Sequence, residues 1–209
     1  MKSFYLNTNK FLRKPTGGVY SLPYYGKGRP RNPDFLYNLK NNFIKTRPRS
    51  EHLLKKDKNK LMEVFREDLK KITKISKVNP LTVCVVPRAK AEGSYETNQL
   101  IFRETVGEIL NEIPSLNNGI GFISRHTNTR TTHLKRREVG FVNDGDHPYP
   151  GIAKDTCHFD SRINGLDILL IDDIYTKPVN IAEDMVQSLY DSGAKSVLFY
   201  AVGYTVKKY

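Results

Sequence analysis

Apolar residues change their spacing along the chain, and the change predicts the order of secondary-structure elements. Within residues 57–76, Leu61, Phe65, Leu69 and Ile72 recur every three or four positions, which predicts an amphipathic helix with a lysine-rich polar face. The later part of the chain instead alternates short β-branched runs with helical stripes. Those runs predict strands over 81–86, 119–124, 167–172 and 196–205, with helices over 97–113 and 180–193.

Strands that alternate with helices indicate a doubly wound α/β fold with a mostly parallel sheet. The chain has 209 residues, enough for one such domain with an appendage. We place the domain at residues 56–209, with its core at about 80–205. Residues 125–160 are polar and lack a period, and a loop of that length is usually a lid, a binding loop or a disordered segment.

Residues 1–55 contain most of the turn-forming chemistry. The stretch KPTGGVYSLPYYGKGRPRNP has no sustained period, so we predict an irregular basic N-terminal arm ahead of one long helix. Two states of this arm stay open. It is either disordered, or it wraps the domain through its aromatic residues Tyr20, Tyr24, Tyr25, Phe35 and Tyr37.

Positive charge is concentrated in the first part of the chain. Residues 1–80 hold 20 Lys and Arg against 6 Asp and Glu, a formal charge of +14, whereas the remainder has 14 against 16. Such asymmetry points to a polyanionic partner such as nucleic acid. The tyrosines of the arm could stack on the bases of a single strand while its basic groups contact phosphates. The alternative is that the aromatics pack on the domain and the charges are solvated.

Composition narrows the cellular setting. The chain has no apolar run of membrane-spanning length and no signal-peptide pattern at its N-terminus, so we expect no membrane association. Cys84 and Cys157 do not form a disulfide framework, and the histidines show no metal-ligand spacing with each other or with cysteine. A reducing cytoplasm is the expected compartment, and the assembly state is open, a homodimer included.

The stretch ILLIDDIYTKPVNI, residues 168–181, ends a buried strand on two carboxylates, Asp172 and Asp173. In doubly wound sheets, ligands bind outside the carboxyl ends of the strands. Two carboxylates there can accept hydrogen bonds from vicinal ribose hydroxyls or hold Mg²⁺ through waters, and the following helix start offers amides to a phosphate. The competing interpretation is that the aspartates simply end the strand and start a turn. A metal-dependent phosphotransfer site is less favoured, because the runs at 81–86 and 119–124 add no third acid.

Three stretches in order resemble a known family. ILLIDDIYTKPVNIAEDMVQSLYDSGAKSV resembles the phosphoribosyl pyrophosphate motif of type I phosphoribosyltransferases. VVPRAKAEGSYETNQLIFRETVGEIL resembles the first strand, pyrophosphate loop and helix of the competence-protein F branch, and TRTTHLKRREVGF resembles its basic stretch. The match covers roughly residues 80–205. The resemblance implies the type I phosphoribosyltransferase fold and a ligand that is phosphoribosyl pyrophosphate or a nucleotide.

The resemblance also implies roles for individual residues. Asp172 and Asp173 would bind the ribose hydroxyls and help to place Mg²⁺, and Thr131 would belong to a lid over the pyrophosphate together with the catalytic cations Lys135, Arg136 and Arg137. The remaining ligand-binding residues fall in the pyrophosphate loop and the 5′-phosphate loop, and they are Arg88, Ala89, Lys90, Tyr175, Thr176, Lys177, Val179 and Asn180. An active member would transfer phosphoribosyl to a nitrogen nucleophile.

The phosphate loop departs from the family pattern. The family usually continues Thr-Thr-Gly-x-Thr, whereas this chain has Thr176-Lys177-Pro178-Val179-Asn180. Pro178 lacks an N–H and removes one phosphate donor. Lys177 could add compensating charge, and Asn180 could cap the following helix. Two functions therefore stay open: a phosphoribosyltransferase, and a catalytically inactive relative that binds a nucleotide or nucleic acid in DNA processing, competence or defence.

Overall fold

The computed structural model describes residues 1–26, 28–42, 47–76, 78–131, 143–145 and 150–206. The strands in these residues are β1 (Lys2–Leu6), β2 (Thr16–Tyr24), β3 (Leu81–Val85), β4 (Leu116–Asn118), β5 (Ile123–Arg125), β6 (Cys157–Phe159), β7 (Asp167–Tyr175) and β8 (Ser196–Thr205). The helices are α1 (Asp34–Lys40), α2 (Glu51–Ile75), α3 (Ile101–Leu110), α4 (Ala153–Thr156) and α5 (Ile181–Asp191). None of the helices described here is long and apolar enough to cross a membrane.

One six-stranded mixed sheet organises the chain, with strand order β1-β2-β8-β7-β3-β4. Every neighbouring pair in it is parallel except β1 and β2, which are antiparallel. β5 and β6 form a separate antiparallel pair. The predicted α/β class with a mostly parallel sheet is confirmed.

The middle of the sheet is β7, which pairs with β8 on one side and β3 on the other. Its residues Ile168, Leu169, Leu170 and Ile171 are completely buried. Leu169 and Ile171 belong to one core cluster, and Ile168 and Leu170 to the other. A parallel strand with both faces covered needs this unbroken apolar run, because neither face is open to water.

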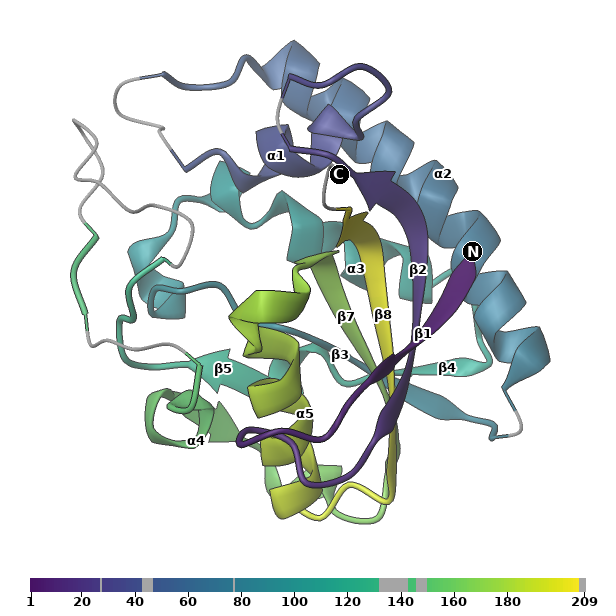
Figure 1. Cartoon of the computed structure of the whole chain (residues 1–209). Helices are drawn as coiled ribbons and strands as arrows, with labels where there is room; N and C mark the ends of the chain where they lie inside the picture. The colour runs from purple at the N-terminus through teal and green to yellow at the C-terminus, as the bar shows by residue number, and fades with distance from the viewer. Residues whose placement is uncertain (27, 43–46, 77, 132–142, 146–149, 207–209) are drawn as a thin grey trace.

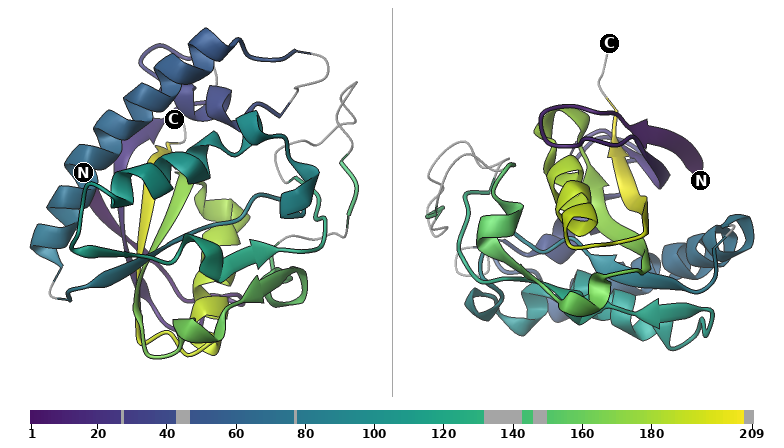
Figure 2. Two further views of the ribbon diagram at one scale, coloured as in Figure 1. Left: turned by 180° about the vertical axis from the view of Figure 1, so that it is seen from behind. Right: turned by 90° about the horizontal axis from the view of Figure 1, so that it is seen from below.

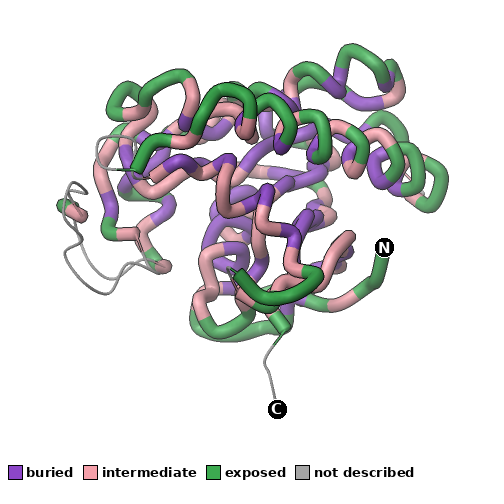
Figure 3. The backbone as a smooth tube through the Cα atoms, turned by 90° about the horizontal axis from the view of Figure 1, so that it is seen from above, coloured by how far each residue is buried: buried purple, intermediate pink, exposed green. Residues whose placement is uncertain are grey.

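Helices cover both faces of the sheet. The first core cluster packs side chains of α1, α2 and α3 against one face, and the second packs α5 and α4 against the opposite face. Figure 1 shows α5 in front of β7 and β8, and the left view of Figure 2, seen from behind, shows α2 and α3 on the opposite face of the sheet. Buried positions gather in the middle of the molecule, while the outer turns of the helices are exposed (Figure 3). The arrangement is three-layered, as expected for a doubly wound sheet.

The predicted irregular N-terminal arm is wrong for residues 2–6 and 16–24, which form strands. β2 joins the main sheet parallel to β8, and β1 pairs with β2 at the edge. The sequence did not predict β2 because it contains Gly17, Gly18 and Pro23, and glycine and proline are rare in strand interiors. Pro23 is tolerated because the pairing of β2 with β1 ends at Tyr20. Beyond that residue β2 is hydrogen-bonded only to β8, so a missing N–H on the other side costs nothing.

Gly18 makes room for an aromatic ring rather than for a turn. A Cβ at this position would lie 2.7 Å from the Phe4 ring of the paired strand. That ring packs against Tyr20, Tyr175 and Phe199, with centroid distances of 5.0–6.2 Å. The N-terminal strands are therefore fastened to β7 and β8 by aromatic packing as well as by hydrogen bonds.

Other predicted elements need adjustment. The strand expected over 119–124 is replaced by β4, a 3₁₀ turn at Ile120–Phe122, and β5. This happens because its apolar residues divide between the two cores: Ile120 packs with the first and Ile123 with the second. α2 begins at Glu51 because the Ser50 side chain accepts a hydrogen bond from Leu53 N at 3.3 Å, inside the predicted arm.

The helix expected over 97–113 and the loop expected over 125–160 also differ from the structure. The helix proper is limited to α3, and a separate 3₁₀ turn at Thr97–Gln99 precedes it. Within the expected loop, α4 and β6 are regular, and Ala153 and Cys157 are buried in the second core. Short elements of this kind carry too few residues to show a period in the sequence.

Adjacent glycines provide a test of the β1–β2 packing. Gly18→Ala should lower the free energy of unfolding by about 1–3 kcal/mol, because the new methyl group overlaps the Phe4 ring. Gly17→Ala is the matched control, since its Cβ would meet only Leu198 Cδ1 at 3.8 Å, an ordinary contact. Urea unfolding of both variants measures the difference. Equal stabilities would contradict the placement of Phe4 against β2.

Candidate functional site

A cavity of about 570 Å³ opens at the carboxyl ends of β3 and β7. From β3 the chain passes to β4 on one side, and later returns to β7 on the other side of β3. This is a topological switch point, where ligands of doubly wound sheets bind. The ends of β3 and β7, α1, α3 and the start of α5 all contribute to the wall. The fold thus places a cavity at the edge that the sequence indicated.

The two carboxylates reach the cavity because β7 is longer than β3. The last pair between these strands joins Val85 to Ile171, and Val86 N donates to Ile171 O at 2.9 Å. Beyond that point β7 pairs only with β8, beginning with Asp172 opposite Ala201. Asp172 and Asp173 therefore lie inside the strand, not after it, on a stretch whose β3 side is open. Both line the cavity.

Backbone amides hold the carboxylates in place. Asp172 accepts a hydrogen bond from Asp173 N at 2.8 Å, and Asp173 accepts one from Ile174 N at 2.6 Å. Burial and the neighbouring charge of Asp173 raise the pKa of Asp172 to about 8, while Lys40 opposes the shift. Two adjacent carboxylates in an enclosed space resist double ionisation. The pair is thus suited to a ligand that donates hydrogen bonds or brings positive charge.

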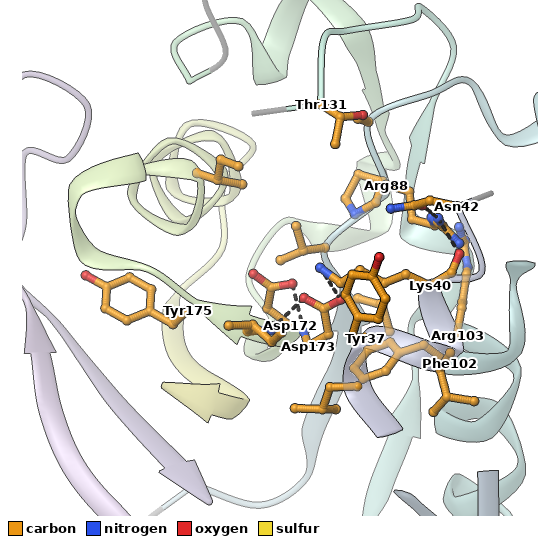
Figure 4. A pocket seen from close by; sticks show the side chains of 18 of the residues that line it. Tyr37, Lys40, Asn42, Arg88, Phe102, Arg103, Thr131, Asp172, Asp173 and Tyr175 are labelled. Carbon is orange, nitrogen blue, oxygen red and sulfur yellow. Dashed lines mark hydrogen bonds and ion pairs between the residues drawn. The ribbon is translucent and has the colours of Figure 1, made fainter. Parts of the chain in front are cut away.

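Lys40, at the end of α1, is a site residue that sequence reasoning missed. Its ammonium lies 2.8 Å from Asp173 Oδ2, and both side chains are about 20% exposed. Figure 4 shows Lys40 beside the carboxylates, with Tyr37 and Phe102 on the same side. No spacing in the sequence links Lys40 to residues more than a hundred positions later. Only the placement of the N-terminal segment over the sheet edge brings them together.

Arg88 lines the cavity, but its guanidinium is committed to the backbone. It donates to the carbonyls of Lys40, at 2.8 Å, and Gln99, and to the Asn42 side chain. The guanidinium also stacks on the Tyr95 ring at 4.4 Å, and burial lowers its pKa. Arg88 therefore fixes the end of α1 above the site.

The rest of the expected pyrophosphate loop also makes internal contacts. Ala89 lines the cavity, and its carbonyl accepts from Thr129 N at 2.7 Å. Lys90 is 7% exposed and does not line the cavity; its ammonium donates to Thr129 O at 3.0 Å and pairs with Asp144 at 2.7 Å. Of the expected lid, Thr131 lines the cavity, whereas Lys135, Arg136 and Arg137 lie outside the described residues.

The phosphate loop forms a 3₁₀ turn, Lys177–Val179, closed by a hydrogen bond from Val179 N to Thr176 O at 2.9 Å. Thr176 and Val179 line the cavity, whereas Lys177 is exposed outside it. The predicted side-chain cap is wrong: Asn180 stands at the N-cap of α5 without such a bond. Its backbone is left-handed, with φ 58°, and not in the extended conformation of a usual N-cap residue. Its side-chain oxygen instead accepts a hydrogen bond from Asn9 at 3.0 Å.

Tyr175 and the start of α5 complete this end of the cavity. Tyr175 contributes to the wall, but its hydroxyl points away from the carboxylates (Figure 4) and donates to Glu183 at 2.7 Å. Ile181 and Ala182, the first residues of α5, also line the cavity. The first amides of a helix have no intrahelical acceptor and carry positive potential. The α5 N-terminus can therefore receive an anionic group.

The donor set for a metal is small. No group of three or more His, Cys, Asp or Glu that could hold a metal occurs in the part of the chain that the structure describes. Asp172 and Asp173 are two carboxylates, and Lys40 already occupies one oxygen. Mg²⁺ commonly binds through one or two carboxylates together with waters and substrate phosphates. The residues fit a magnesium ion that arrives with a phosphorylated ligand.

Comparisons with known proteins assign no family. No protein-family model matches the chain, and comparison with curated proteins gives no match. The resemblance to phosphoribosyltransferases therefore rests on the order of its three motifs. The cavity at the switch point is an independent observation, because it follows from the strand order and the relative lengths of β3 and β7.

The raised pKa of Asp172 predicts a cost in stability. Between the usual aspartate pKa of about 3.9 and the folded value of about 8, the folded state keeps a proton that the unfolded state loses. Stability contributed by this group is thus present at low pH and lost as pH rises through that window. Asp172→Asn should raise the melting temperature by roughly 2–6 °C at pH 8 and leave it unchanged near pH 4.

Asp167, at the opposite end of β7, is the matched control. Hydrogen bonds from Ser196 and Lys195 lower its pKa, so its stabilising contribution is lost at low pH instead. Asp167→Asn should lower the melting temperature at neutral pH, with a smaller difference below pH 4. Thermal unfolding followed by circular dichroism from pH 3 to 9 distinguishes the two. A destabilised Asp172→Asn at pH 8 would show that its carboxyl is not held protonated.

Proposed function

We propose that the cavity binds a ribose phosphate, either phosphoribosyl pyrophosphate or a nucleotide. The observation that carries this proposal is the presence of Asp172, Asp173 and the N-terminus of α5 in one cavity. A pair of carboxylates accepts hydrogen bonds from vicinal hydroxyls, and a helix N-terminus favours a phosphate. The two features recognise the two ends of a ribose 5-phosphate.

In this proposal the hydroxyls of the ribose donate to Asp172 and Asp173, and the 5′-phosphate lies at the first amides of α5 beside the Thr176 hydroxyl. Thr176 shares a hydrogen bond with Thr205 at 2.7 Å, which keeps its hydroxyl at the cavity wall. Pro178 offers no amide, so α5 rather than the loop supplies most donors. Magnesium ion, held by Asp172 and the diphosphate, would neutralise charge on the phosphate oxygens.

As a transferase, the site would join a nitrogen nucleophile to the anomeric carbon of the ribose while the bond from that carbon to pyrophosphate breaks. Positive groups at the pyrophosphate would stabilise its departure, and we assign this role to Arg130, which lines the cavity, and to Lys135, Arg136 and Arg137. An apolar wall formed by Tyr24, Tyr37, Leu100 and Phe102 faces the same space and suits a planar acceptor.

A second candidate function rests on a separate groove of about 920 Å³. Its apolar part includes Leu22, Pro33 and Phe35, and its basic residues are Arg31, His52, Lys55, Lys56 and Lys60. All five basic residues are exposed, and three acidic residues share the lining, Asp34, Asp57 and Glu63, of which Glu63 pairs with Lys60 at 2.8 Å. We propose that this basic groove binds single-stranded nucleic acid, with bases over the apolar part and phosphates on the rim.

The groove changes the interface that the sequence suggested. Tyr20 packs against Tyr204 with ring centroids 4.7 Å apart, and Tyr24 and Tyr37 line the first cavity. These rings therefore pack within the fold, which agrees with the alternative that the aromatic residues of the arm contact the domain and not nucleic acid. The basic surface instead lies on the N-terminal half of α2 and the segment before α1. Nucleic-acid binding by this groove is better tested by charge reversal than by deletion of residues 1–55, because the deletion would remove β1 and β2 from the sheet.

Isothermal titration with phosphoribosyl pyrophosphate in the presence of Mg²⁺ tests the first function. The double variant Asp172→Asn/Asp173→Asn should weaken binding by about tenfold or more, because Asp173 loses its charge and each side chain exchanges an acceptor oxygen for an amide group that only donates. Asp167→Asn, on the same strand but outside the cavity, should bind as the wild type does. An absence of heat at high protein concentration, or binding that the double variant leaves intact, would refute the proposal.

Charge reversal on α2 tests the second function. Lys55→Glu/Lys56→Glu should weaken binding of a labelled single-stranded oligonucleotide and reduce the salt dependence by about two phosphate contacts. Lys70→Glu/Lys74→Glu makes the same change of charge at the far end of the same helix, outside the groove. Fluorescence anisotropy across a salt series compares them. Equal losses in both variants would mean that net charge, not the groove, drives binding.

A further inference from the structure

Lys40 is positioned by hydrogen bonds to its own backbone and to the two residues that follow it. The carbonyl of Lys40 accepts from Arg88 at 2.8 Å, and that of Asn41 accepts from the buried Gln99 side chain at 3.0 Å. Arg88 also donates to the Asn42 side chain. Three consecutive residues are thus tied to the segment that follows β3, so the lysine emerges from a fixed backbone.

Backbone geometry at the end of α1 contributes to the same placement. Asn41 ends the helix in the left-handed conformation, with φ 41°, and its N–H donates to Asn38 O at 3.0 Å. It is 3% exposed, and its Oδ1 accepts from Arg49 N at 3.2 Å. The chain is therefore turned immediately after Lys40, which leaves the ammonium directed into the cavity beside Asp173 (Figure 4).

The ion pair occupies the place where a metal would otherwise reach Asp173. One oxygen of this carboxylate accepts from Ile174 N, and the other is 2.8 Å from the Lys40 ammonium. Two adjacent carboxylates in a cavity attract a divalent cation, because its charge compensates both. An ammonium fixed at Asp173 supplies part of that compensation internally and cannot be diluted away.

We propose that Lys40 is a built-in cation of this site that excludes divalent metal ions from Asp173. The carboxylate pair then binds free Mg²⁺ or Mn²⁺ weakly, and metal enters only with a phosphorylated ligand. Lys40 thereby determines how strongly ligand binding depends on metal. The effect of Lys40 on sugar-phosphate binding rests on the proposed function, whereas the exclusion of free metal ions from Asp173 does not.

Metal alone provides the first test. Electron paramagnetic resonance of Mn²⁺ titrated into the protein should show weak binding by the wild type and by Lys40→Arg, which keeps the charge. Lys40→Met and Lys40→Gln should bind Mn²⁺ about tenfold more tightly or better. Adding Asp173→Asn to either variant should abolish the gain. The same weak binding in folded Lys40→Met and Lys40→Gln would overturn the proposal.

Lys58→Met is the matched structural control. Lys58 forms an ion pair with Glu108 at 2.6 Å and is 29% exposed, comparable to Lys40, but it lies outside the cavity. Its removal should leave Mn²⁺ affinity unchanged. A gain as large as that of Lys40→Met would show that loss of any surface cation strengthens metal binding, which would also overturn the proposal.

Ligand titration separates this inference from the proposed function. For phosphoribosyl pyrophosphate, the ratio of Kd in EDTA to Kd in Mg²⁺ should be about tenfold larger for Lys40→Met than for the wild type. Ligand binding with equal ratios would overturn the role of Lys40 and leave the proposed function intact. A metal effect as expected without any ligand binding would refute the proposed function and leave metal exclusion by Lys40 standing.

Discussion

The structure depends on accommodating two adjacent carboxylates on its central strand. Asp172 and Asp173 follow four completely buried residues of β7 and are themselves partly buried, so the protein must meet their need for hydrogen bonds and compensating charge. Three features meet it: amides of β7 itself, the open side left by the short β3, and the ammonium of Lys40. Burial of a charge is tolerated only when it is paired or hydrogen-bonded. Much of the surrounding chain serves this requirement.

The N-terminal segment is part of that solution and not an appendage. β2 extends the sheet next to β8, which brings the following α1 across the carboxyl edge of the strands. Arg88 and Gln99 then fasten the end of α1. Residues 1–55 thus supply two strands, a helix, the start of α2 and one wall of the cavity. A boundary at residue 55 would divide a continuous core.

The parts of the fold that the sequence predicted are those with strong local signals. β8 spans residues 196–205, the predicted range, and β7 begins at Asp167 as predicted, since buried parallel strands are continuous apolar runs. β2 gave no such signal, because Gly18 makes room for the Phe4 ring and Pro23 lies where β2 has no partner strand on one side. Packing between distant segments, not local preference, made it a strand.

The candidate site also has residues that the sequence predicted and residues that it could not predict. Asp172 and Asp173 could be found because the motif is contiguous, and both line the cavity. Lys40 could not, since its partner lies 133 positions away, and Arg88 and Lys90 satisfy structural oxygens that the sequence does not reveal. A basic residue in a motif indicates charge at a position, but only the fold decides whether that charge faces a ligand or the protein's own carbonyls.

The acidic residues at the start of α5 would repel a phosphate if they were exposed and ionised, but both are buried and hydrogen-bonded. Glu183 and Asp184 lie in the first turn and are 2% and 8% exposed, and burial raises the pKa of both. Tyr175 donates to Glu183, while the amides of Gly151 and Ala153 donate to Asp184. Negative charge there is either suppressed or compensated within the core. The N-terminal end of the α5 dipole then dominates this end of the cavity, which favours an anion despite the acidic sequence.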